Sequence, residues 1–576
     1  MPRKTDVADP YTPLASPAKP PSSRSDASTT APSHLDGTER GLDNGSRPGR
    51  GDVSRSEGQK GGAEVVFSRR RRWFLLFLFS VSQYLDIASR SSTVAFVPMI
   101  MEDLDISYET STWVMNSYGV PFASFLLLFG KVADLYSAKP VFTFGFLFCG
   151  LSSILISFMT DQYAFYVFRA LYGIRAAATI PSAFRLILAV FPAGEVQMAL
   201  GLFSLSAALA NTTGLIIGGL FGLIDQTGQM AAWRWYFRAV AMISIPCALA
   251  AHLVAPWTGS THPDVTRKWK YLDLPGCLLI LSALMLLNVG LVTGASRGWT
   301  TADFFAPFLV SWPLAVVFFL YEARKDPDSA LLPKTIWRVP NLTLMVFVSL
   351  PMFAALASSQ LPLVERYQSV FGESIIKSAV RILPQGVSMC ITIILISPVL
   401  KKVSNMRYLL TIGFLVGGAM FVPFIYGDGE IGTKYWKYYF PSFVIGAALE
   451  VIAFLAANIT IMTSVPPSMA GVAGALFQSA LQNGVVIAYS VQAGLMTVHP
   501  GSVANFDNVR IGFWALAGWG WLCGLLVLVL YKRPARSASS TKASQENQGE
   551  GDTVELSKRG KGSDASLTRE RGDDSV

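Results

Sequence analysis

The sequence predicts an all-α polytopic membrane protein with about fourteen transmembrane helices. The chain has 576 residues, of which 51% are hydrophobic and only 15% are charged, whereas soluble domains carry about 25% charged residues. Apolar runs of about 20 residues recur along most of the chain, and a helix of that length spans the roughly 30 Å hydrocarbon core of a bilayer. The runs lie at about 73–100, 112–129, 140–159, 163–184, 199–224, 235–256, 272–294, 304–321, 342–364, 379–400, 407–427, 438–463, 471–497 and 511–531.

The basic residues predict how these spans are oriented. Four arginines, Arg69 to Arg72, directly precede the first span, and such a cluster keeps that end of a span in the cytosol. Lysine and arginine recur in every second link, so an even number of spans places both termini in the cytosol. The net charge of +9 thus serves membrane sorting and does not indicate nucleic-acid binding.

Both ends of the chain are polar tails. Residues 1–68 and 534–576 are rich in small and polar residues and poor in aromatic ones, so we expect them to be disordered. No apolar stretch follows the start of the chain, which predicts that the first span, and not a signal peptide, directs insertion.

The composition also excludes several kinds of site. The five cysteines lie inside apolar runs without metal-ligand spacing, and no phosphate-binding loop or dinucleotide-binding motif is present. We therefore expect no metal site and no ATP-driven pumping by this chain.

Charged side chains inside the predicted spans are the first candidates for function. Asp86 lies about 20 Å along the first span, and Arg90 follows four residues later on the same face. Charges at that depth are costly unless they are paired or face a wet cavity, so the two residues form either a structural ion pair or part of the site. Glu450 has no basic residue within a turn of its own helix. We therefore expect Glu450 to carry protons and Asp86 to stay ionised beside Arg90.

Other polar residues in the spans are weaker candidates. Asn458 follows Glu450 on the same helical face. Gln478 and Gln482 lie in the last span but one, at 471–497. Their amides fit either interhelical hydrogen bonds or contacts to a substrate.

The link 130–139 is predicted to be a tight turn at one membrane face. Gly130 lets the preceding helix end without a side chain in the way. Asp134 lies between Lys131 and Lys139, and this charge cluster can latch one helix bundle to another. A plain basic turn between two helices is the alternative interpretation.

This link resembles the signature loop of the major facilitator superfamily, in which Gly130, Asp134 and Lys139 match and other positions differ. Three further segments resemble motifs of its fourteen-span drug:proton antiporter family. They are Trp113 to Tyr118, Arg169 to Ala177, where Arg175 replaces a small residue, and the glycines Gly214, Gly218 and Gly219, where Leu215 replaces a proline. The stretch Glu450 to Gly484 is similar to fungal aminotriazole-resistance-type transporters.

The resemblance implies a major facilitator fold of two six-helix bundles, at 69–256 and 339–533, with two additional spans in a linker at 257–338. It implies a monomeric transporter that uses the proton gradient, exports a small organic molecule such as a drug, toxin or secondary metabolite, and resides in the plasma membrane or an internal membrane. It also implies that Arg169 takes part in proton transfer. Since alternating access needs no covalent chemistry, we expect a protein that is not an enzyme and has no cofactor. Uptake of a small nutrient or ion, and a non-transporting membrane sensor, are the alternatives.

Overall fold

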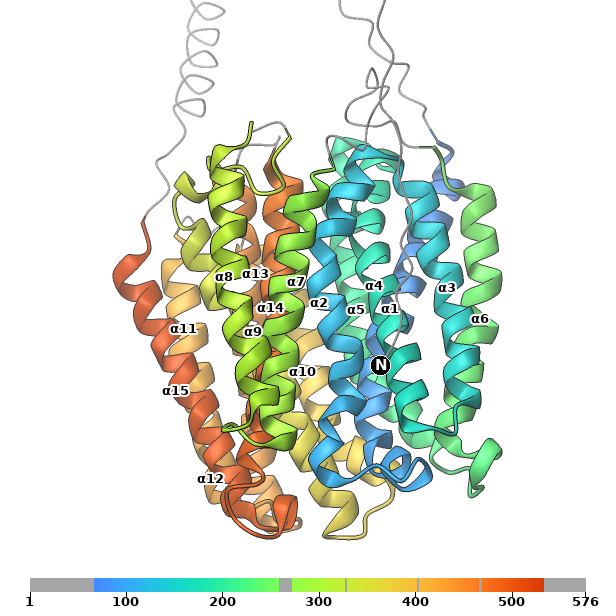
Figure 1. The fold of residues 1–576 in the computed structure, drawn as a ribbon, viewed down its shortest axis with the longest axis vertical. Helices are drawn as coiled ribbons and strands as arrows, with labels where there is room; N and C mark the ends of the chain where they lie inside the picture. Colours follow the sequence, from blue (N-terminus) through green and yellow to red (C-terminus); the bar gives the residue numbers. More distant parts are fainter. Residues whose placement is uncertain are drawn as a thin grey trace, which may run out of the picture. The chain divides into compact units, whose positions relative to one another are not determined.

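A computed structural model describes residues 67–257, 272–326, 329–400, 403, 405–465 and 469–532, which are helical and contain no strand (Figure 1). Two residues of the predicted N-terminal tail, Phe67 and Ser68, are described. The rest of that tail and the whole C-terminal tail, 534–576, lie outside the described residues. The Ser68 hydroxyl accepts a hydrogen bond from the Arg71 amide and so caps the first helix.

Six helices form what we call the N-terminal bundle. They are α1 (Arg69–Asp103), α2 (Thr112–Leu135), α3 (Ala138–Phe158), α4 (Gln162–Val190), α5 (Ala193–Phe221) and α6 (Ala232–Val254). Within it α1 packs against α5, α2 against α4, and α3 against both α4 and α6. We call the end that holds the α2–α3 turn the inner end and the opposite end the outer end.

A second set of helices forms the C-terminal bundle. They are α9 (Leu342–Ser369), α10 (Ile375–Leu400), α11 (Met406–Ala419), α12 (Phe421–Tyr426), α13 (Phe440–Ser464), α14 (Ala470–Leu495) and α15 (Phe506–Leu530). One predicted span is divided at Met420 into α11 and α12, and a π-helical turn, Tyr435–Tyr439, leads into α13. The two bundles meet where α2 packs against α14 and where α5 packs against α10.

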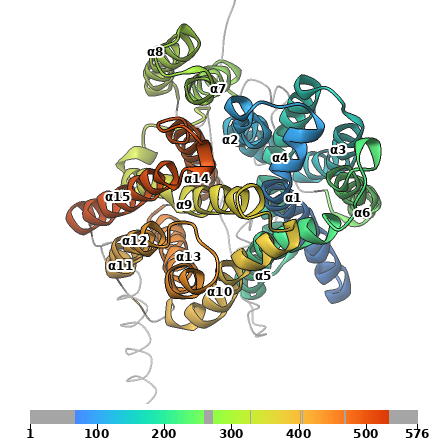
Figure 2. The ribbon, with the colours of Figure 1, turned by 90° about the horizontal axis from the view of Figure 1, so that it is seen from below.

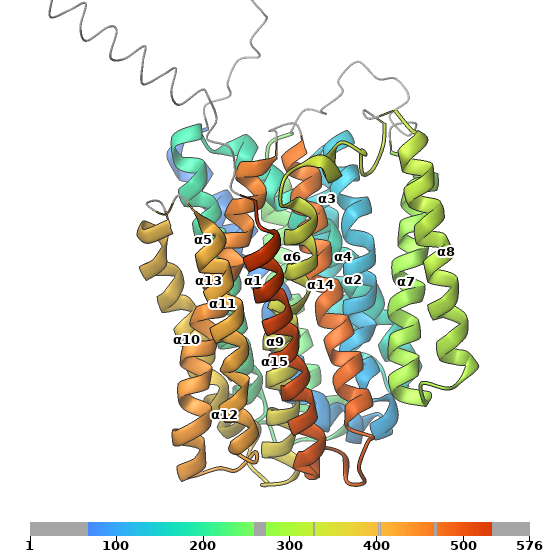
Figure 3. The same ribbon diagram turned by 90° about the vertical axis from the view of Figure 1, so that its left-hand side faces the viewer.

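The two additional spans are α7 (Leu274–Arg297) and α8 (Ala302–Arg324), which pack against each other. Helix α7 also contacts α2 and α14, and Figure 2 shows α8 on the far side of α7 from that pair. Figure 3 shows the same two helices side by side at one edge of the bundle. Only Ser311, Phe318 and Glu322 of α8 are buried, so the rest of this helix is available to contact lipid.

The prediction of about fourteen spans agrees with the structure once α1 is considered. Thirteen helices of the described residues are long and apolar enough to cross a membrane, and α1 is not among them. Its buried residues include Ser82, Gln83, Asp86 and Ser89, which lower its hydropathy. These polar groups are tolerated because α1 lies between α5, α6 and α9 and is shielded from lipid. With 35 residues, α1 is long enough to be the fourteenth span.

The turn between α2 and α3 is shorter than expected. Helix α2 does not end at Gly130 but continues to Leu135, and α3 begins at Ala138. Only Tyr136 and Ser137 connect the two helices. Gly130 therefore does not end a helix, and its role must come from its neighbours in space.

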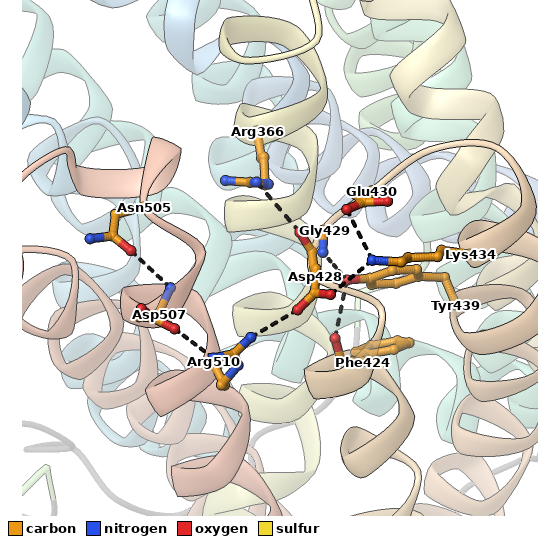
Figure 4. Close-up of polar contacts among 10 residues, drawn as sticks. All are labelled: Arg366, Phe424, Asp428, Gly429, Glu430, Lys434, Tyr439, Asn505, Asp507 and Arg510. Atoms are coloured by element: carbon orange, nitrogen blue, oxygen red, sulfur yellow. Dashed lines mark hydrogen bonds and ion pairs between the residues drawn. The ribbon is translucent and has the colours of Figure 1, made fainter.

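A polar network joins two loops at the outer end of the C-terminal bundle (Figure 4). Asp428, in the loop after α12, forms ion pairs with Lys434 at 2.9 Å and with Arg510 of α15 at 2.8 Å. The Arg366 guanidinium of α9 donates to the backbone oxygens of Val503 and Ala504 at 2.8 and 2.7 Å. The network ties α9, α12 and α15 together at that end.

Candidate functional site

Asp86 lies at the centre of a buried polar group in the N-terminal bundle. Its Oδ1 is 2.7 Å from the Arg175 guanidinium of α4, and its Oδ2 accepts a hydrogen bond from the Tyr118 hydroxyl of α2 at 3.0 Å. Asp86 and Arg175 are each 2% exposed. The expected pairing of Asp86 with Arg90 is thus wrong, because the carboxylate is held by side chains from two other helices.

Arg90 instead reaches across to the C-terminal bundle. Its NH1 donates to the Gln482 Oε1 of α14 at 3.1 Å. Of the two roles considered for Gln482, an interhelical hydrogen bond is the one this conformation shows. The Arg90–Gln482 contact joins the two bundles at a point where polar side chains from both meet.

Arg175 occupies space that a small residue would leave empty. Its guanidinium lies 3.8 Å from the centre of the Tyr172 ring, which gives a cation–π contact in addition to the ion pair. Close approach of the helices is preserved at Gly173, where an added Cβ would lie 2.3 Å from the Tyr118 carbonyl oxygen of α2. Arg175, which replaces a small residue of the motif, is therefore accommodated by its neighbour Tyr172.

Arg169 is a second buried cation. It is 1% exposed, donates to the Val114 carbonyl at 3.3 Å and lies over the rings of Tyr118 and Phe237. No acid forms an ion pair with Arg169 among the described residues. The buried centre thus has two arginines and one aspartate, an excess of positive charge that suits an anionic or polar group.

Glu450 lies in a separate cavity inside the C-terminal bundle. The cavity has a volume of about 60 Å³ and is lined by residues of α9, α10, α11, α13 and α15, among them Ser359, Gln385 and Phe414. No basic residue lines it, and the buried Oε1 of Glu450 has no hydrogen-bond partner among the described residues. The structure therefore does not bring Glu450 and Asp86 together.

Two other predicted residues lie outside this cavity. Asn458 is half-buried on α13, and Gln478 is half-buried on α14 with an unpartnered, buried Oε1. Neither residue lines the Glu450 cavity.

Glu365 was missed by sequence reasoning. It lines a second cavity, of about 40 Å³, at the outer end between α1, α2, α7, α9 and α14, together with Tyr108, Thr112 and Tyr489. Burial and the nearby Glu365 carboxylate raise the pKa of Tyr108. The predicted span stopped at residue 364, whereas α9 continues to Ser369. An acid one residue beyond an apolar run was the available signal.

The signature turn contacts other parts of the structure. An added Cβ at Gly130 would lie 3.3 Å from the Ala475 Cβ, so α2 and α14 approach closely there. Lys131 Nζ donates to the Ala330 carbonyl at 3.1 Å, and Lys139 Nζ lies 5.2 Å from the centre of the Trp257 ring. The Asp134 side chain lies outside the described residues, so its latch role stays a prediction.

The glycines of α5 lie at two different interfaces. An added Cβ at Gly214 would lie 2.9 Å from the Ala88 backbone of α1, and one at Gly218 would lie 3.2 Å from Ser92. Gly219 instead faces Ile376 of α10 in the other bundle, at 2.7 Å. These glycines allow α5 to approach both neighbours, as small residues do in membrane helices.

In the part of the chain that the structure describes, no three His, Cys, Asp or Glu residues are grouped so that they could hold a metal ion. Asp86, Glu450 and Glu365 lie in three separate places, and of these three acids only Asp86 forms an ion pair within the described residues.

Comparison with known proteins agrees with this picture. The sequence profile of the Major Facilitator Superfamily matches residues 73–490. The Major facilitator superfamily multidrug transporter mfsC of Aspergillus fumigatus is 23% identical over 466 residues, which cover 79% of this chain and 86% of that protein. The tetracenomycin C resistance and export protein of Streptomyces glaucescens is 29% identical over 443 residues, which cover 76% and 78%. A crystal structure of a POT family transporter in complex with 5-aminolevulinic acid shares the fold, with a TM-score of 0.58 at 14% identity, over 79% of this chain and 95% of that one.

Proposed function

The chain belongs to the Major Facilitator Superfamily, and on that premise we propose that it exports a small organic molecule in exchange for protons. It is an integral membrane transporter and not an enzyme. Relatives named for resistance to or export of tetracenomycin C, puromycin and methylenomycin A support the direction of transport and the class of cargo. The Aspergillus relative, a multidrug transporter, supports the proposal that this chain is related to fungal drug exporters.

The observation that carries the proton coupling is the uncompensated carboxyl group of Glu450. An ionised acid inside a helix bundle without a nearby cation is costly, and this cost disappears when the group takes up a proton. Binding and release of a proton at Glu450 would therefore change the energy of the C-terminal bundle. Asp86 differs, because Arg175 compensates its charge in the conformation described.

The transport cycle follows from the way the two bundles meet. A rocking motion about the α2–α14 and α5–α10 junctions would open a path to one side of the membrane at a time. The substrate would bind between the bundles near Arg90 and Gln482, where a polar group could replace their mutual hydrogen bond. Glu365 lines a separate cavity at the outer end and is a second acid that an external proton could reach.

Several parts of the proposal concern the protein in its cell. We expect both termini in the cytosol, a monomer without a cofactor, the proton gradient as the energy source and the plasma membrane as the location, with an internal membrane as the alternative. These follow from the arginines before α1 and from the family.

The test uses reconstituted vesicles with an imposed pH gradient and puromycin or tetracenomycin C as the transported probe. We expect Glu450→Gln to lose uphill accumulation while it keeps substrate exchange in the absence of a gradient. Glu365→Gln is the competing variant, because it removes the carboxyl group of the other cavity, which also has no ion-pair partner among the described residues. Normal uphill transport by Glu450→Gln would contradict the assignment. Loss of uphill transport in Glu365→Gln alone would move the proton site to the outer cavity.

A further inference from the structure

A chain of hydrogen bonds connects the additional helix α7 to the junction between the two bundles. The Asn288 Nδ2 of α7 donates to the Asn483 Oδ1 of α14 at 2.8 Å. The Asn483 Nδ2 in turn donates to the Ser479 carbonyl at 2.8 Å, and the Ser479 hydroxyl donates to the Ala123 carbonyl of α2 at 3.1 Å. Three helices are thus joined in sequence, and one of them belongs to neither bundle.

The residues of this hydrogen-bond chain are buried and closely packed. Asn288 is fully buried, and Asn483 and Ser479 are 7% and 3% exposed. Val120 of α2, Val292 of α7 and Val486 of α14 form a buried apolar cluster along the same junction. Hydrogen bonds in such surroundings are not exposed to competing water, so they hold the three helices in a defined register.

Stability alone does not explain the asparagine in α7. The Oδ1 of Asn288 is buried and has no hydrogen-bond partner among the described residues. An unsatisfied buried polar atom has a free-energy cost that an apolar side chain of similar size would avoid. The position that Asn288 imposes on α14 is a better explanation for a polar side chain here.

Helices α2 and α14 are also contacted near the inner end. The Leu332 amide, in the segment between α8 and α9, donates to the Glu322 Oε2 of α8 at 3.0 Å. Two residues earlier, the Ala330 carbonyl accepts from the Lys131 Nζ of α2. Leu331 and Leu332 are buried in a cluster that includes Leu127 of α2 and Leu476 of α14. Helix α7 and the segment between α8 and α9 therefore contact the α2–α14 junction at two levels.

We propose that Asn288 is a positioning residue for the transport cycle, which holds α14 against α2 through Asn483 and Ser479. Because α2 and α14 lie in different bundles, this contact favours the conformation in which their inner halves are close. The inference rests on the proposed transport function, since it concerns the equilibrium between the states of the cycle. Its structural part can be tested without any transported substrate.

The test measures how close α2 and α14 stay at the inner end. Cysteines at Gly130 and Ala475 would have Cβ atoms close to the separation found in disulfides, about 3.5–4.5 Å. The rate of cross-linking in the full-length protein in vesicles then reports closure of the junction, and each single-cysteine variant controls for the native cysteines. We expect Asn288→Leu to slow cross-linking about threefold to tenfold, as loss of one membrane hydrogen bond predicts. Transport should show a lower kcat with an unchanged KM.

Ser311→Ala is the matched control. Ser311 is a buried hydroxyl on α8 whose hydrogen bond goes to Phe308 of its own helix, so we expect no change in the cross-linking rate. The double variant Asn288→Leu/Asn483→Leu should be no slower than the more affected single variant, because both substitutions remove the same contact. If Asn288→Leu does not fold, Asn288→Ser, which is too short for the contact, is measured in its place.

The outcomes separate this inference from the proposed function. Equal cross-linking rates in the Asn288 variant and in Ser311→Ala would overturn the positioning role. Slower cross-linking in a protein that moves no probe would support the positioning role and contradict the proposed export of these compounds.

Discussion

Asp86 is compensated by partners that lie 32 and 89 residues away in the sequence. Two neighbours in space, Tyr118 and Arg175, satisfy both of its carboxylate oxygens. Arg175 depends on this contact in return, because its Nε and NH1 have no hydrogen-bond partner among the described residues. Removing one member of a buried pair leaves the other charge without compensation, which costs about 3–5 kcal/mol.

We therefore expect Asp86→Asn to reduce the amount of folded protein and to lower its thermal midpoint in detergent. The double variant Asp86→Leu/Arg175→Met removes both charges and should recover much of the stability, although not transport. Size-exclusion profiles and melting curves of the purified variants provide the measurement. A wild-type melting curve for Asp86→Asn would show that the pair contributes little to the fold.

At the scale of the element, α5 contains glycines in two very different surroundings. Gly214 lies against the α1 backbone, and the Ser92 hydroxyl of α1 donates to the Gly214 carbonyl at 2.6 Å. Gly201 lies between three and four turns nearer the start of the same helix. It has nothing within 4 Å of an added Cβ. The two positions share a helix and differ in packing.

This contrast makes a matched pair of substitutions. Gly214→Ala should destabilise the protein by about 1–3 kcal/mol, because the new methyl group overlaps backbone atoms that cannot easily move. Gly201→Ala should be neutral or slightly stabilising, since alanine favours the helix by roughly 0.5–1 kcal/mol. The measurement is the thermal midpoint of each purified variant. Equal midpoints would contradict the prediction, because they would mean that α1 and α5 can move apart without loss of stability.

The outer network of the C-terminal bundle predicts a dependence on pH (Figure 4). The hydrogen bond from Lys434 is the largest cause that lowers the pKa of Asp428, and that from Arg510 adds to it against the opposing effect of burial. A carboxyl group whose pKa is lowered on folding stabilises the folded state above its usual pKa, about 3.9. That contribution is lost as the pH falls through the lowered pKa.

We thus expect the outer loops to stay joined at neutral and mildly acidic pH and to separate only below about pH 4. Asp428→Asn should show the separated state already at neutral pH. Limited proteolysis of the loops after α12 and α14, measured against pH, tests this. The effect on stability should be small because the groups are partly exposed, and cleavage that is equal in both proteins at pH 7 would contradict the prediction.

At the scale of the whole molecule, the orientation in the membrane is the property most open to test. The predicted cytosolic tail contains the glycosylation sequence Asn44-Gly45-Ser46. Expressed in a eukaryotic cell, the protein should show no change in mobility on enzymatic deglycosylation that depends on Asn44. A shift that Asn44→Gln abolishes would place the tail outside and reverse every assignment of inner and outer ends.

Some properties of this protein follow from the sequence by itself. Runs of apolar residues indicate helices that cross a bilayer, because hydrocarbon can solvate neither charges nor free backbone groups. Their number, their order and the helical class of the fold are therefore local properties. The same reasoning located Asp86 and Glu450, since a charge within an apolar run is visible without a structure, whereas Arg169 was identified by its resemblance to a family motif.

The tertiary structure decided which of these groups are partners. Arg90 lies one turn from Asp86, yet Arg175 holds the carboxylate, because the direction of each side chain depends on which helix packs against it. Glu365 became a candidate only when α9 extended beyond its apolar run into a cavity. Asn288 gained a role only through α14. Interactions between helices distant in sequence depend on packing, which hydropathy and spacing within one helix do not encode.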